Sequence, residues 1–499
     1  MNNRLCVDSY KQSHAWQYPP NTTRTFSYIE CRGSEREYKE SVFFGLQYAL
    51  KEYFSTPITL AEVEEAKEIT ELHGLPFNYE GWRHILNAHD GNIPLRIKAV
   101  AEGSVIPNKN VLVTVENTCD KCYWVTSFFE TVLLRSVWYP LTVATQSYYL
   151  RKLIYSYLEE TADNPDDEII FKLHDFGSRG VSSRESAGIG GLAHLTSFMG
   201  TDTMDALLVG RKYYNEPMAG MSIPAAEHST ISSWGRSGEE DAYRNMLKTF
   251  GQKGKMFAVV LDTWNVYRAC ERLIGENLKQ EIIDSGATAV LRPDSGIPVD
   301  VLCGRDTKNL IHLDYKYYKP KTGADWGMSA IGEEVPDYLI KGVLGILEEK
   351  FGVTINSKGY KVLNHVRVIQ GDGVNPKSIK EILERMKTLG YSASNIAFGM
   401  GGALLQKVNR DTLKMAYKCS AIEINNEWRP VWKDPITDPG KTSKMGRLDL
   451  VKDGNEYATV SENNEHDSEL VTYFENGEVL VDYTFDEIRK RLENHLKIT

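Results

Sequence analysis

The feature that most constrains the fold is a repeat in the middle of the sequence, where apolar strand-like runs alternate with helical patterns. Between about residues 169 and 405, each such run leads into glycines or carboxylates and then into a helix-like segment; the runs are 169–173, 257–261, 289–291, 366–369 and 395–398. Parallel strands need crossover connections of this kind. The pattern therefore predicts repeated β-α units around parallel strands, as in (β/α) barrels and open α/β sheets.

The two ends of the sequence have a different pattern. Residues 95–99 and 111–115 alternate in the manner of half-buried antiparallel strands, and Asn476-Gly477 is typical of a tight hairpin turn. Thr59-Leu-Ala-Glu62 and Thr484-Phe-Asp-Glu487 have the spacing of capping boxes, so we expect helices to begin there.

The polar residues of the repeat all follow the carboxyl ends of the predicted strands, the edge at which α/β proteins build their sites. Gly399-Met-Gly-Gly402 and Gly371-Asp-Gly373 would let backbone N–H groups close on a phosphate, although close strand–helix packing explains single glycines equally well. Cations for several phosphates follow downstream, although each of them taken singly is typical of a surface charge; they are Arg410, Lys418, Lys433 and Lys441.

Three further motifs carry candidate chemistry, each with a structural alternative. Arg292-Pro-Asp294 would hold a phosphate or ring and a ribose diol, or form an internal salt bridge. His228 follows Glu227, which would tune the imidazole for phosphoryl chemistry unless His228 is a hydrogen-bonded core residue. The 174–179 loop offers an aromatic ring and a cation, Phe176 and Arg179.

Charge and cysteine content indicate which partners and which cellular environment to expect. Lys+Arg number 58 and Asp+Glu 68, and the resulting net charge of −10 argues against nucleic acid or an anionic membrane as a partner. No run of 18 uncharged apolar residues appears, so no membrane span is expected. Seven scattered cysteines favour a reducing, cytoplasmic environment. Cys119-Asp-Lys-Cys122 has metal-ligand spacing, but no second Cys or His pair follows, which favours a turn between a strand and a helix.

Taken together, several long motifs resemble the nicotinamide phosphoribosyltransferase family of type II phosphoribosyltransferases. The resemblance runs from Asp8 to Lys490 and rests on Asp8-Ser-Tyr-Lys11, Tyr18-Pro-Pro-Asn21, His174-Asp-Phe-Gly-Ser-Arg-Gly-Val-Ser-Ser183, Gly200-Thr-Asp-Thr203, Pro224-Ala-Ala-Glu-His-Ser-Thr230, Arg292-Pro-Asp-Ser-Gly296, Gln370-Gly-Asp-Gly373 and Gly401-Gly-Ala-Leu-Leu-Gln-Lys407. It implies an irregular (β/α) barrel domain over residues 161–405, with an insertion at about 304–336. It also implies a β-rich α+β domain built from residues 1–160 and 406–499, and a homodimer with two shared active sites.

The reaction implied by the resemblance joins nicotinamide to phosphoribosyl pyrophosphate in the presence of Mg²⁺, giving nicotinamide mononucleotide and pyrophosphate. ATP is implied as a co-substrate that phosphorylates a histidine, here His228. The implied catalytic residues are His228, Arg292 and Asp294. The implied substrate-binding residues are Tyr10 from the partner subunit, Phe176, Arg179, Asp202, Ser222, Gly371, Asp372, Gly401, Gly402 and Arg410. The wider phosphate cluster is Arg32, Lys418, Lys433 and Lys441, and no metal ligand is assigned.

Two alternatives stay open: a nicotinate phosphoribosyltransferase, and a non-catalytic nucleotide-binding protein of the same fold. Asp202 argues against the first, because its carboxylate would face the carboxylate of nicotinate. The chain departs from the family pattern in having Asn265 for a usual aspartate, Ala416 for a usual serine and a longer 304–336 insertion.

Overall fold

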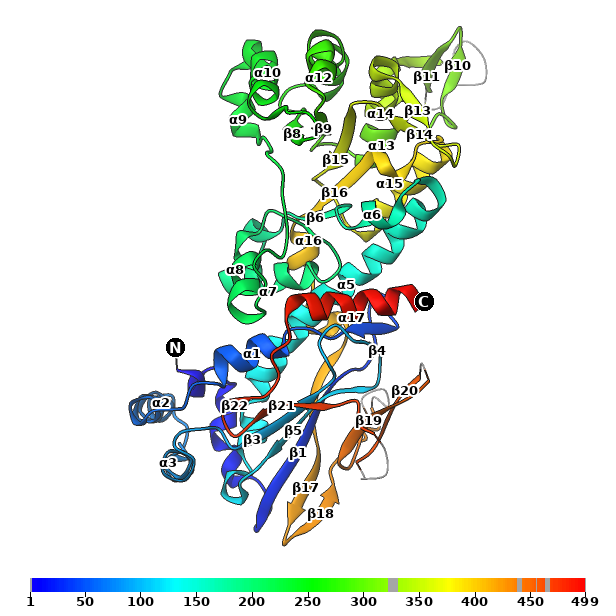
Figure 1. The fold of residues 1–499 in the computed structure, drawn as a ribbon. Coiled ribbons are helices and arrows are strands. Elements are labelled where there is room, and N and C mark those ends of the chain that lie inside the picture. The colour runs from blue at the N-terminus through cyan, green and yellow to red at the C-terminus, as the bar shows by residue number, and fades with distance from the viewer. Residues whose placement is uncertain (1, 322–330, 438–441, 455, 463–466, 499) are drawn as a thin grey trace.

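A computed structural model describes residues 2–321, 331–437, 442–454, 456–462 and 467–498. The chain has two parts, a curled parallel sheet with helices around it and a β-rich part, which the long helix α5 (Glu130–Thr161) connects (Figure 1). The expected fold class, an irregular barrel of β-α units together with a β-rich α+β part, is confirmed. The boundaries at residues 160 and 405 stay predictions.

The parallel sheet has six strands in the order β7-β6-β16-β15-β9-β8. These strands are β6 (Leu173–Asp175), β7 (Gly200–Thr201), β8 (Met256–Val260), β9 (Thr288–Arg292), β15 (Val366–Gln370) and β16 (Ile396–Met400). All five neighbouring pairs are parallel, so their carboxyl ends lie along one edge.

One predicted strand is wrong. Residues 169–173 were expected to form it, but helix α6 (Pro165–Ile169) extends to Ile169 and β6 begins only at Leu173. Pro165 at the first helical position and three acidic residues in the first turn favour a helix start, and this local preference prevails over the apolar run that follows.

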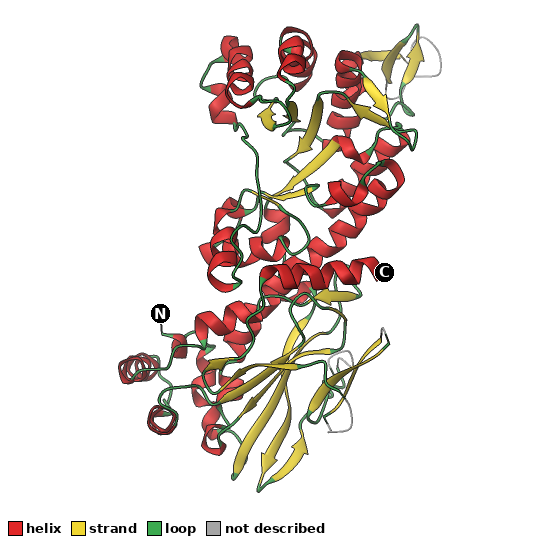
Figure 2. Cartoon of the chain, in the orientation of Figure 1, coloured by secondary structure: helices red, strands yellow, loops and turns green. Residues whose placement is uncertain are grey.

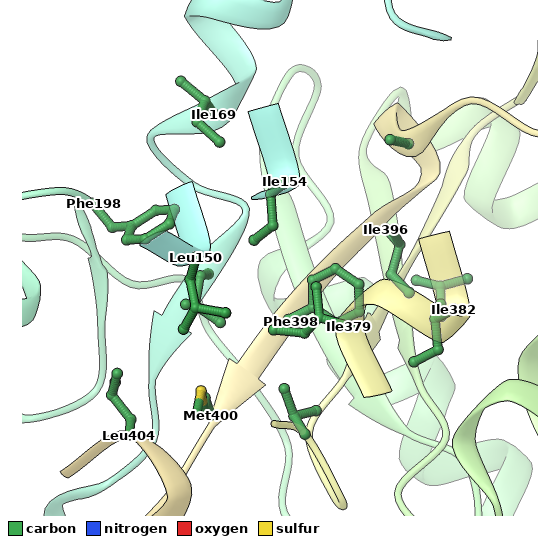
Figure 3. Close-up of a cluster of buried hydrophobic side chains, with 14 of the residues drawn as sticks. Leu150, Ile154, Ile169, Phe198, Ile379, Ile382, Ile396, Phe398, Met400 and Leu404 are labelled. Carbon is green, nitrogen blue, oxygen red and sulfur yellow. The ribbon is translucent and has the colours of Figure 1, made fainter. Parts of the chain in front are cut away.

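Helices cover the parallel sheet, as Figure 2 shows. They are α7 (Arg184–His194), α8 (Met204–Tyr213), α9 (His228–Ser232), α10 (Glu239–Phe250), α11 (Val266–Arg268), α12 (Lys279–Ser285), α13 (Pro298–Cys303), α14 (Asp337–Phe351), α15 (Pro376–Thr388) and α16 (Gly402–Leu405). Apolar side chains of α5, β16 and α15 meet in one cluster; Figure 3 labels Leu150, Ile154, Ile379, Ile382 and Phe398 among them. This packing fixes the sheet on the upper half of α5.

The second large sheet is antiparallel and draws strands from both ends of the chain. Its order is β18-β17-β1-β5-β3-β21-β22, with bounds Glu427–Pro430, Met415–Ile424, Thr22–Cys31, Val111–Asn117, Leu95–Ala99, Val471–Glu475 and Glu478–Val479. β3 alternates buried and half-buried residues as predicted, whereas β5 is buried at every residue and not half-buried. β5 lies inside the sheet, and β19 (Leu448–Asp453) packs against it.

The predicted local signals are present in this part. Thr59 and Glu62 form a capping box at the start of α2 (Leu60–Leu72), and Thr484 and Glu487 exchange the corresponding hydrogen bonds before α17 (Phe485–Ile498). Asn476 and Gly477 both have positive φ and join β21 to β22. The other elements here are α1 (Leu46–Tyr53), α3 (Tyr79–Ala88), α4 (Val125–Phe128), β2 (Glu40–Val42), β4 (Val105–Pro107) and β20 (Glu456–Ser461).

The described residues of the 304–336 insertion form a small antiparallel sheet. Its strands are β10 (Ile311–Leu313), β11 (Lys316–Pro320) and β12 (Ile331–Val335), and it projects from the top of the molecule (Figure 1). Nearby, β13 (Val353–Ile355) pairs with β14 (Lys361–Leu363). Among the described helices, none has both the length and the apolar composition needed to cross a bilayer.

A buried carboxyl group in the β-rich part predicts a pH dependence of stability. Burial raises the pKa of Glu102 to about 7, although its carboxylate accepts backbone hydrogen bonds from Gly45 (3.1 Å) and Gln47 (2.8 Å). Because the folded pKa lies above the unfolded one, the stabilising contribution is complete below about pH 4.5 and is lost as the pH rises through about 7.

Glu102→Gln, which keeps the acceptor but cannot ionise, should therefore flatten the profile of urea-unfolding free energy between pH 5 and 8. The unfolding free energy of the variant should exceed that of the native chain by an amount that grows toward pH 8, to about 3 kcal/mol at most. Glu68→Gln on the exposed face of α2 is the control. A Glu102→Gln profile parallel to that of the native chain would contradict the assignment.

Candidate active site

A cavity of about 480 Å³ lies at the parallel sheet, with an apolar wall and a few polar groups. Four of the predicted site residues line it: Phe176, Asp202, Ser222 and Arg292. Phe176 packs against an apolar floor made by Ala258, Val290 and Ile369 from three neighbouring strands. A Cβ at Gly399 would lie 1.9 Å from the Phe176 ring, so only glycine admits the ring at this place. The cavity is thus shaped for a flat, mainly apolar ring.

A carboxylate and a hydroxyl face this cavity from the segments that follow β7. Ser222 Oγ donates to Asp202 Oδ1 at 2.5 Å, and the Asp202 backbone N–H donates to the carbonyl of Asp175 at 3.0 Å. The side chain of Asp202 is exposed to the cavity and keeps its second oxygen available for another donor. Such a carboxylate suits a ligand that presents N–H or O–H groups.

Asp175 was not among the predicted site residues, yet it fixes the loop that carries Phe176 and Arg179. Its Oδ1 accepts the backbone N–H of Gly177 at 2.7 Å, and burial raises its pKa to about 6. The signal was present in the sequence, because an aspartate two residues before a glycine at a strand end is typical of a side-chain-closed turn.

Arg292 and Asp294 form the predicted internal ion pair and still have capacity for a ligand. Arg292 Nη2 lies 3.3 Å from Asp294 Oδ2, and the side chains are 16% and 19% exposed. Within the described part of the chain, Arg292 Nε and Asp294 Oδ1 are buried without a hydrogen-bond partner. Because a buried polar atom is costly to leave unpaired, these two atoms point to a bound polar group.

Two further carboxylates, those of Asp262 and Asp372, lie near this pair at the ends of neighbouring strands. Burial raises the pKa of Asp294; the Arg292 charge opposes this shift, and the nearby Asp262 and Asp372 charges add to it. A Cβ at Gly371 would lie 2.7 Å from Asp294 Oδ1, so glycine lets the β15 end approach the carboxylate. The cluster combines oxygen ligands with backbone N–H groups.

His228 is not a core histidine, since its side chain is 49% exposed at the start of α9. Its Nε2 lies 3.0 Å from Oδ1 of Asp262, which is almost fully buried. A carboxylate accepts, so Nε2 carries a proton, and in a neutral imidazole of this tautomer the lone pair is on Nδ1. The expectation that Glu227 tunes His228 is wrong, because Glu227 caps α9. The carboxylate that contacts the imidazole is that of Asp262, which was not predicted as a site residue.

The remaining predicted residues lie in two places. Gly401 follows β16 and Gly402 begins α16. A Cβ at Gly402 would meet no atom within 4 Å, so this backbone is open to a ligand. Arg179 is exposed on the short turn Ser178–Gly180, beside Gly402. Asn265 caps α11 by accepting the N–H of Arg268, a role that an aspartate would also perform.

The predicted phosphate cations form a separate group on the seven-stranded sheet. Burial lowers the pKa of Lys418, and the nearby charges of Arg32, Lys433 and Arg410 lower it further against that of Glu130. Lys441 lies outside the described residues. Tyr10 is 55% exposed in the helical segment Ser9–Trp16 of the same part. Across the described ranges, no hydrogen bond or ion pair connects this group to the residues that line the cavity.

Comparison with known proteins places this geometry in a family. The model of the nicotinate phosphoribosyltransferase (NAPRTase) family matches residues 171–478, and that of the nicotinamide phosphoribosyltransferase N-terminal domain matches residues 2–97. The nicotinamide phosphoribosyltransferase of Xanthomonas campestris pv. campestris (strain 8004) is 50% identical over 97% of both chains. This chain belongs to the nicotinamide phosphoribosyltransferase family.

Other members of this phosphoribosyltransferase family are more distant. The nicotinamide phosphoribosyltransferase of Mycoplasma pneumoniae (strain ATCC 29342 / M129 / Subtype 1) is 32% identical over 89% of this chain and 95% of its own. Two solved structures share the fold: nicotinate-nucleotide pyrophosphorylase from Pyrococcus furiosus (TM-score 0.61, 14% identity, 99% and 96% coverage) and human nicotinic acid phosphoribosyltransferase (0.52, 16%, 99% and 94%).

Proposed function

We propose that this phosphoribosyltransferase transfers the phosphoribosyl group of phosphoribosyl pyrophosphate to nicotinamide, giving nicotinamide mononucleotide and pyrophosphate. The observation that carries the proposal is the Asp202–Ser222 pair, which presents a carboxylate oxygen beside Phe176 in the cavity. The relatives named nicotinamide phosphoribosyltransferase support the same assignment.

In this proposal the nicotinamide ring stacks on Phe176 and its carboxamide NH₂ donates to Asp202. Ser222 keeps the Asp202 carboxylate oriented through the 2.5 Å hydrogen bond. Nicotinate would bring a second carboxylate to the same place, where both charges would be poorly solvated. Asp202 therefore favours nicotinamide over nicotinate, which is the substrate named in the description of the matching family model.

The chemistry suits a site without a dedicated base. The pyridine nitrogen is a neutral nucleophile and needs no proton removed. Its lone pair forms the bond to the ribose C1 atom, while the C1–O bond breaks and its electron pair leaves with pyrophosphate. Positive charge grows on the sugar and negative charge on the leaving group, so fixed cations aimed at the leaving oxygens contribute most of the rate. Arg292 and Arg179 are the cations that we assign to this role.

The ribose and phosphate contacts follow from the groups left open. Asp294 Oδ1, buried without a partner among the described residues, accepts from a ribose hydroxyl, and Gly371, Asp372, Gly401 and Gly402 approach the ribose and 5′-phosphate. The carboxylates of Asp262, Asp294 and Asp372 also suit Mg²⁺, which prefers carboxylate and phosphate oxygens. They would hold the ion with the pyrophosphate group, whose charge it would neutralise.

We also propose a homodimer with shared sites. Tyr10 and the cations around Lys418 lie on the β-rich part, whereas the strands β8 and β9 of the cavity lie at the opposite end of the molecule in Figure 1. Tyr10 of the partner subunit would cover the second face of the ring, and the cations would meet phosphates across the interface. Sedimentation of the full chain at twice the monomer mass would agree with this arrangement.

His228 is our candidate for phosphorylation by ATP. Its Nδ1 lone pair is available because Nε2 donates to Asp262, and the exposed ring can meet a γ-phosphoryl group. His228→Gln should reduce the ratio of rates with and without ATP to about one, and should abolish acid-labile labelling from γ-labelled ATP. His312→Gln, in the insertion, is the control. A His228→Gln protein that still takes up the label would exclude this residue.

The activity itself is tested by offering the purified chain phosphoribosyl pyrophosphate and Mg²⁺ with nicotinamide or with nicotinate, and by quantifying the mononucleotide. We expect mononucleotide to form with nicotinamide and not with nicotinate. Product with nicotinate and not with nicotinamide would instead make the chain a nicotinate phosphoribosyltransferase. Tight binding of nicotinamide mononucleotide without turnover of either base would favour the non-catalytic alternative.

A further inference from the structure

Four potential metal ligands meet in the β-rich part, among residues to which the proposed reaction gives no role. They are His84, His89, Cys119 and Cys122, and the ligand atoms that they offer all lie within 4.8 Å of one another. No second Cys or His pair follows Cys122 at a suitable spacing in the sequence. The pair instead precedes the cysteines by 30 to 38 residues, and only the fold brings it to them.

Two rigid elements position these side chains. His84 lies in α3 and His89 caps its carboxyl end, while Cys119 and Cys122 lie in the turn after β5. The turn is fixed by hydrogen bonds to the Cys119 carbonyl from Asn117 Nδ2 (2.8 Å) and from the Cys122 N–H (2.9 Å).

Packing around the cluster fixes the two elements relative to each other. The Trp82 and Trp124 rings pack edge to face at 4.8 Å, and both tryptophans are buried. The ligands thus stand on elements that packing already holds in place, so little further folding is needed for a metal to bind.

The side chains already face one another. His84 Nε2 lies 3.4 Å from Cys119 Sγ, and the two imidazole rings stand 5.6 Å apart at 80°. The Nε2 atom of His89 is buried and has no hydrogen-bond partner among the described residues. A buried ring nitrogen without a partner calls for an explanation, and a bound cation beside it supplies one.

We propose that His84, His89, Cys119 and Cys122 form a structural zinc site. The spacings H-x₄-H and C-x₂-C both fall within the range of tetrahedral zinc sites with two cysteines and two histidines. Zinc bond lengths place neighbouring ligand atoms about 3.3–3.8 Å apart, so small rotations of the side chains suffice from a cluster within 4.8 Å. Two thiolates would neutralise the ion, and each thiol would release its proton to solvent on binding.

The site is distinct from the catalytic cavity in place and in chemistry. It lies on α3 and the end of β5 in the β-rich part, whereas the cavity lies at the parallel sheet (Figure 1). Soft sulfur and nitrogen ligands select zinc over the Mg²⁺ of phosphate chemistry. With four protein ligands no coordination position remains for a substrate, so the ion would fasten the end of α3 to the turn before α4.

The main competing function of a C-x-x-C pair is a redox dithiol. The two histidines distinguish a zinc site from a redox dithiol. A disulfide between Cys119 and Cys122 would make no use of His84 and His89, whereas a zinc ion would bind all four side chains. The structure has both cysteines as free thiols, with one imidazole in contact with Cys119. The arrangement as a whole favours the metal.

The test measures metal on the full-length chain, purified without chelator or affinity metal. We expect about one zinc per chain by mass spectrometry, and, after exchange into Co²⁺, the near-ultraviolet charge-transfer band of a tetrahedral cobalt–thiolate complex. Cys119→Ser and His84→Asn should each weaken zinc binding at least about tenfold and lower the melting temperature. Cys6→Ser and His73→Gln, outside the cluster, are the matched controls.

The half-buried Cys119 and His84 keep the test valid if a substitution at the buried Cys122 prevents folding. Three results would overturn the proposal: no metal bound from excess Zn²⁺, equal zinc content in the Cys119→Ser and control proteins, or a Cys119–Cys122 disulfide in the protein as isolated. Because zinc content is measured directly, none of these results depends on the proposed transferase activity.

Discussion

Arg292→Ala is expected to lower kcat/KM for nicotinamide mononucleotide synthesis by about 10²- to 10³-fold, the cost of removing one fixed charge from a developing anion. Arg292 lines the cavity, pairs with Asp294 at 3.3 Å and has a buried Nε atom without a partner in the described chain. The guanidinium is therefore held in place before the ligand binds, and little reorganisation is needed when charge develops.

Arg292→Lys should recover only part of this loss, because a lysine ammonium is a point charge without the planar fork. Steady-state rates with both substrates varied would separate a lower kcat from a higher KM. Arg268→Ala is the matched control, since Arg268 also pairs with a buried carboxylate, Glu239 at 2.9 Å, but does not line the cavity.

The melting temperatures of the two variants check for unfolding, because each substitution removes the cation from a carboxylate that is at least partly buried. If Arg292→Ala and Arg268→Ala lose activity equally, the loss is structural and the role assigned to Arg292 is wrong.

The parts of the fold that the sequence predicted are those that local chemistry determines. Capping boxes at Thr59 and Thr484, and the Asn476-Gly477 turn, depend on residues within a few positions of one another. The site edge was also predictable, since parallel strands put the residues that follow them on one side of the sheet. Arg292, Asp294 and Gly371 were found in this way.

Asp262 and the four clustered cysteine and histidine side chains were missed because they depend on contacts between distant segments. Asp262 lies 34 residues from the predicted His228, and the two meet only because α9 and β8 are neighbours in the fold. The histidines of α3 and the cysteines after β5 are likewise joined by packing alone. The β6 error has a different cause: the strand has three residues, too few for an alternating pattern to distinguish it from the end of a helix.

Asp202→Asn should relax the choice between amide and acid. In the native chain the carboxylate accepts from the carboxamide NH₂ and repels nicotinate, whereas an asparagine offers both an acceptor and a donor. The Ser222 hydroxyl, which donates to Asp202 Oδ1, can still donate to the asparagine oxygen, so the local geometry should persist. We expect the ratio of kcat/KM for nicotinamide over nicotinate to fall about 100-fold, mostly through a gain with the acid.

The measurement compares both bases under identical phosphoribosyl pyrophosphate and Mg²⁺ conditions, so that changes common to both cancel in the ratio. Asp205→Asn is the matched control, because Asp205 lies three residues away on α8 and pairs with Arg184 at 2.7 Å, away from the cavity wall. It should leave the ratio unchanged. If Asp202→Asn also leaves the ratio unchanged, the carboxylate does not contact the substrate's carboxamide, and selection must come from the remaining cavity residues, with Arg292 the first to examine.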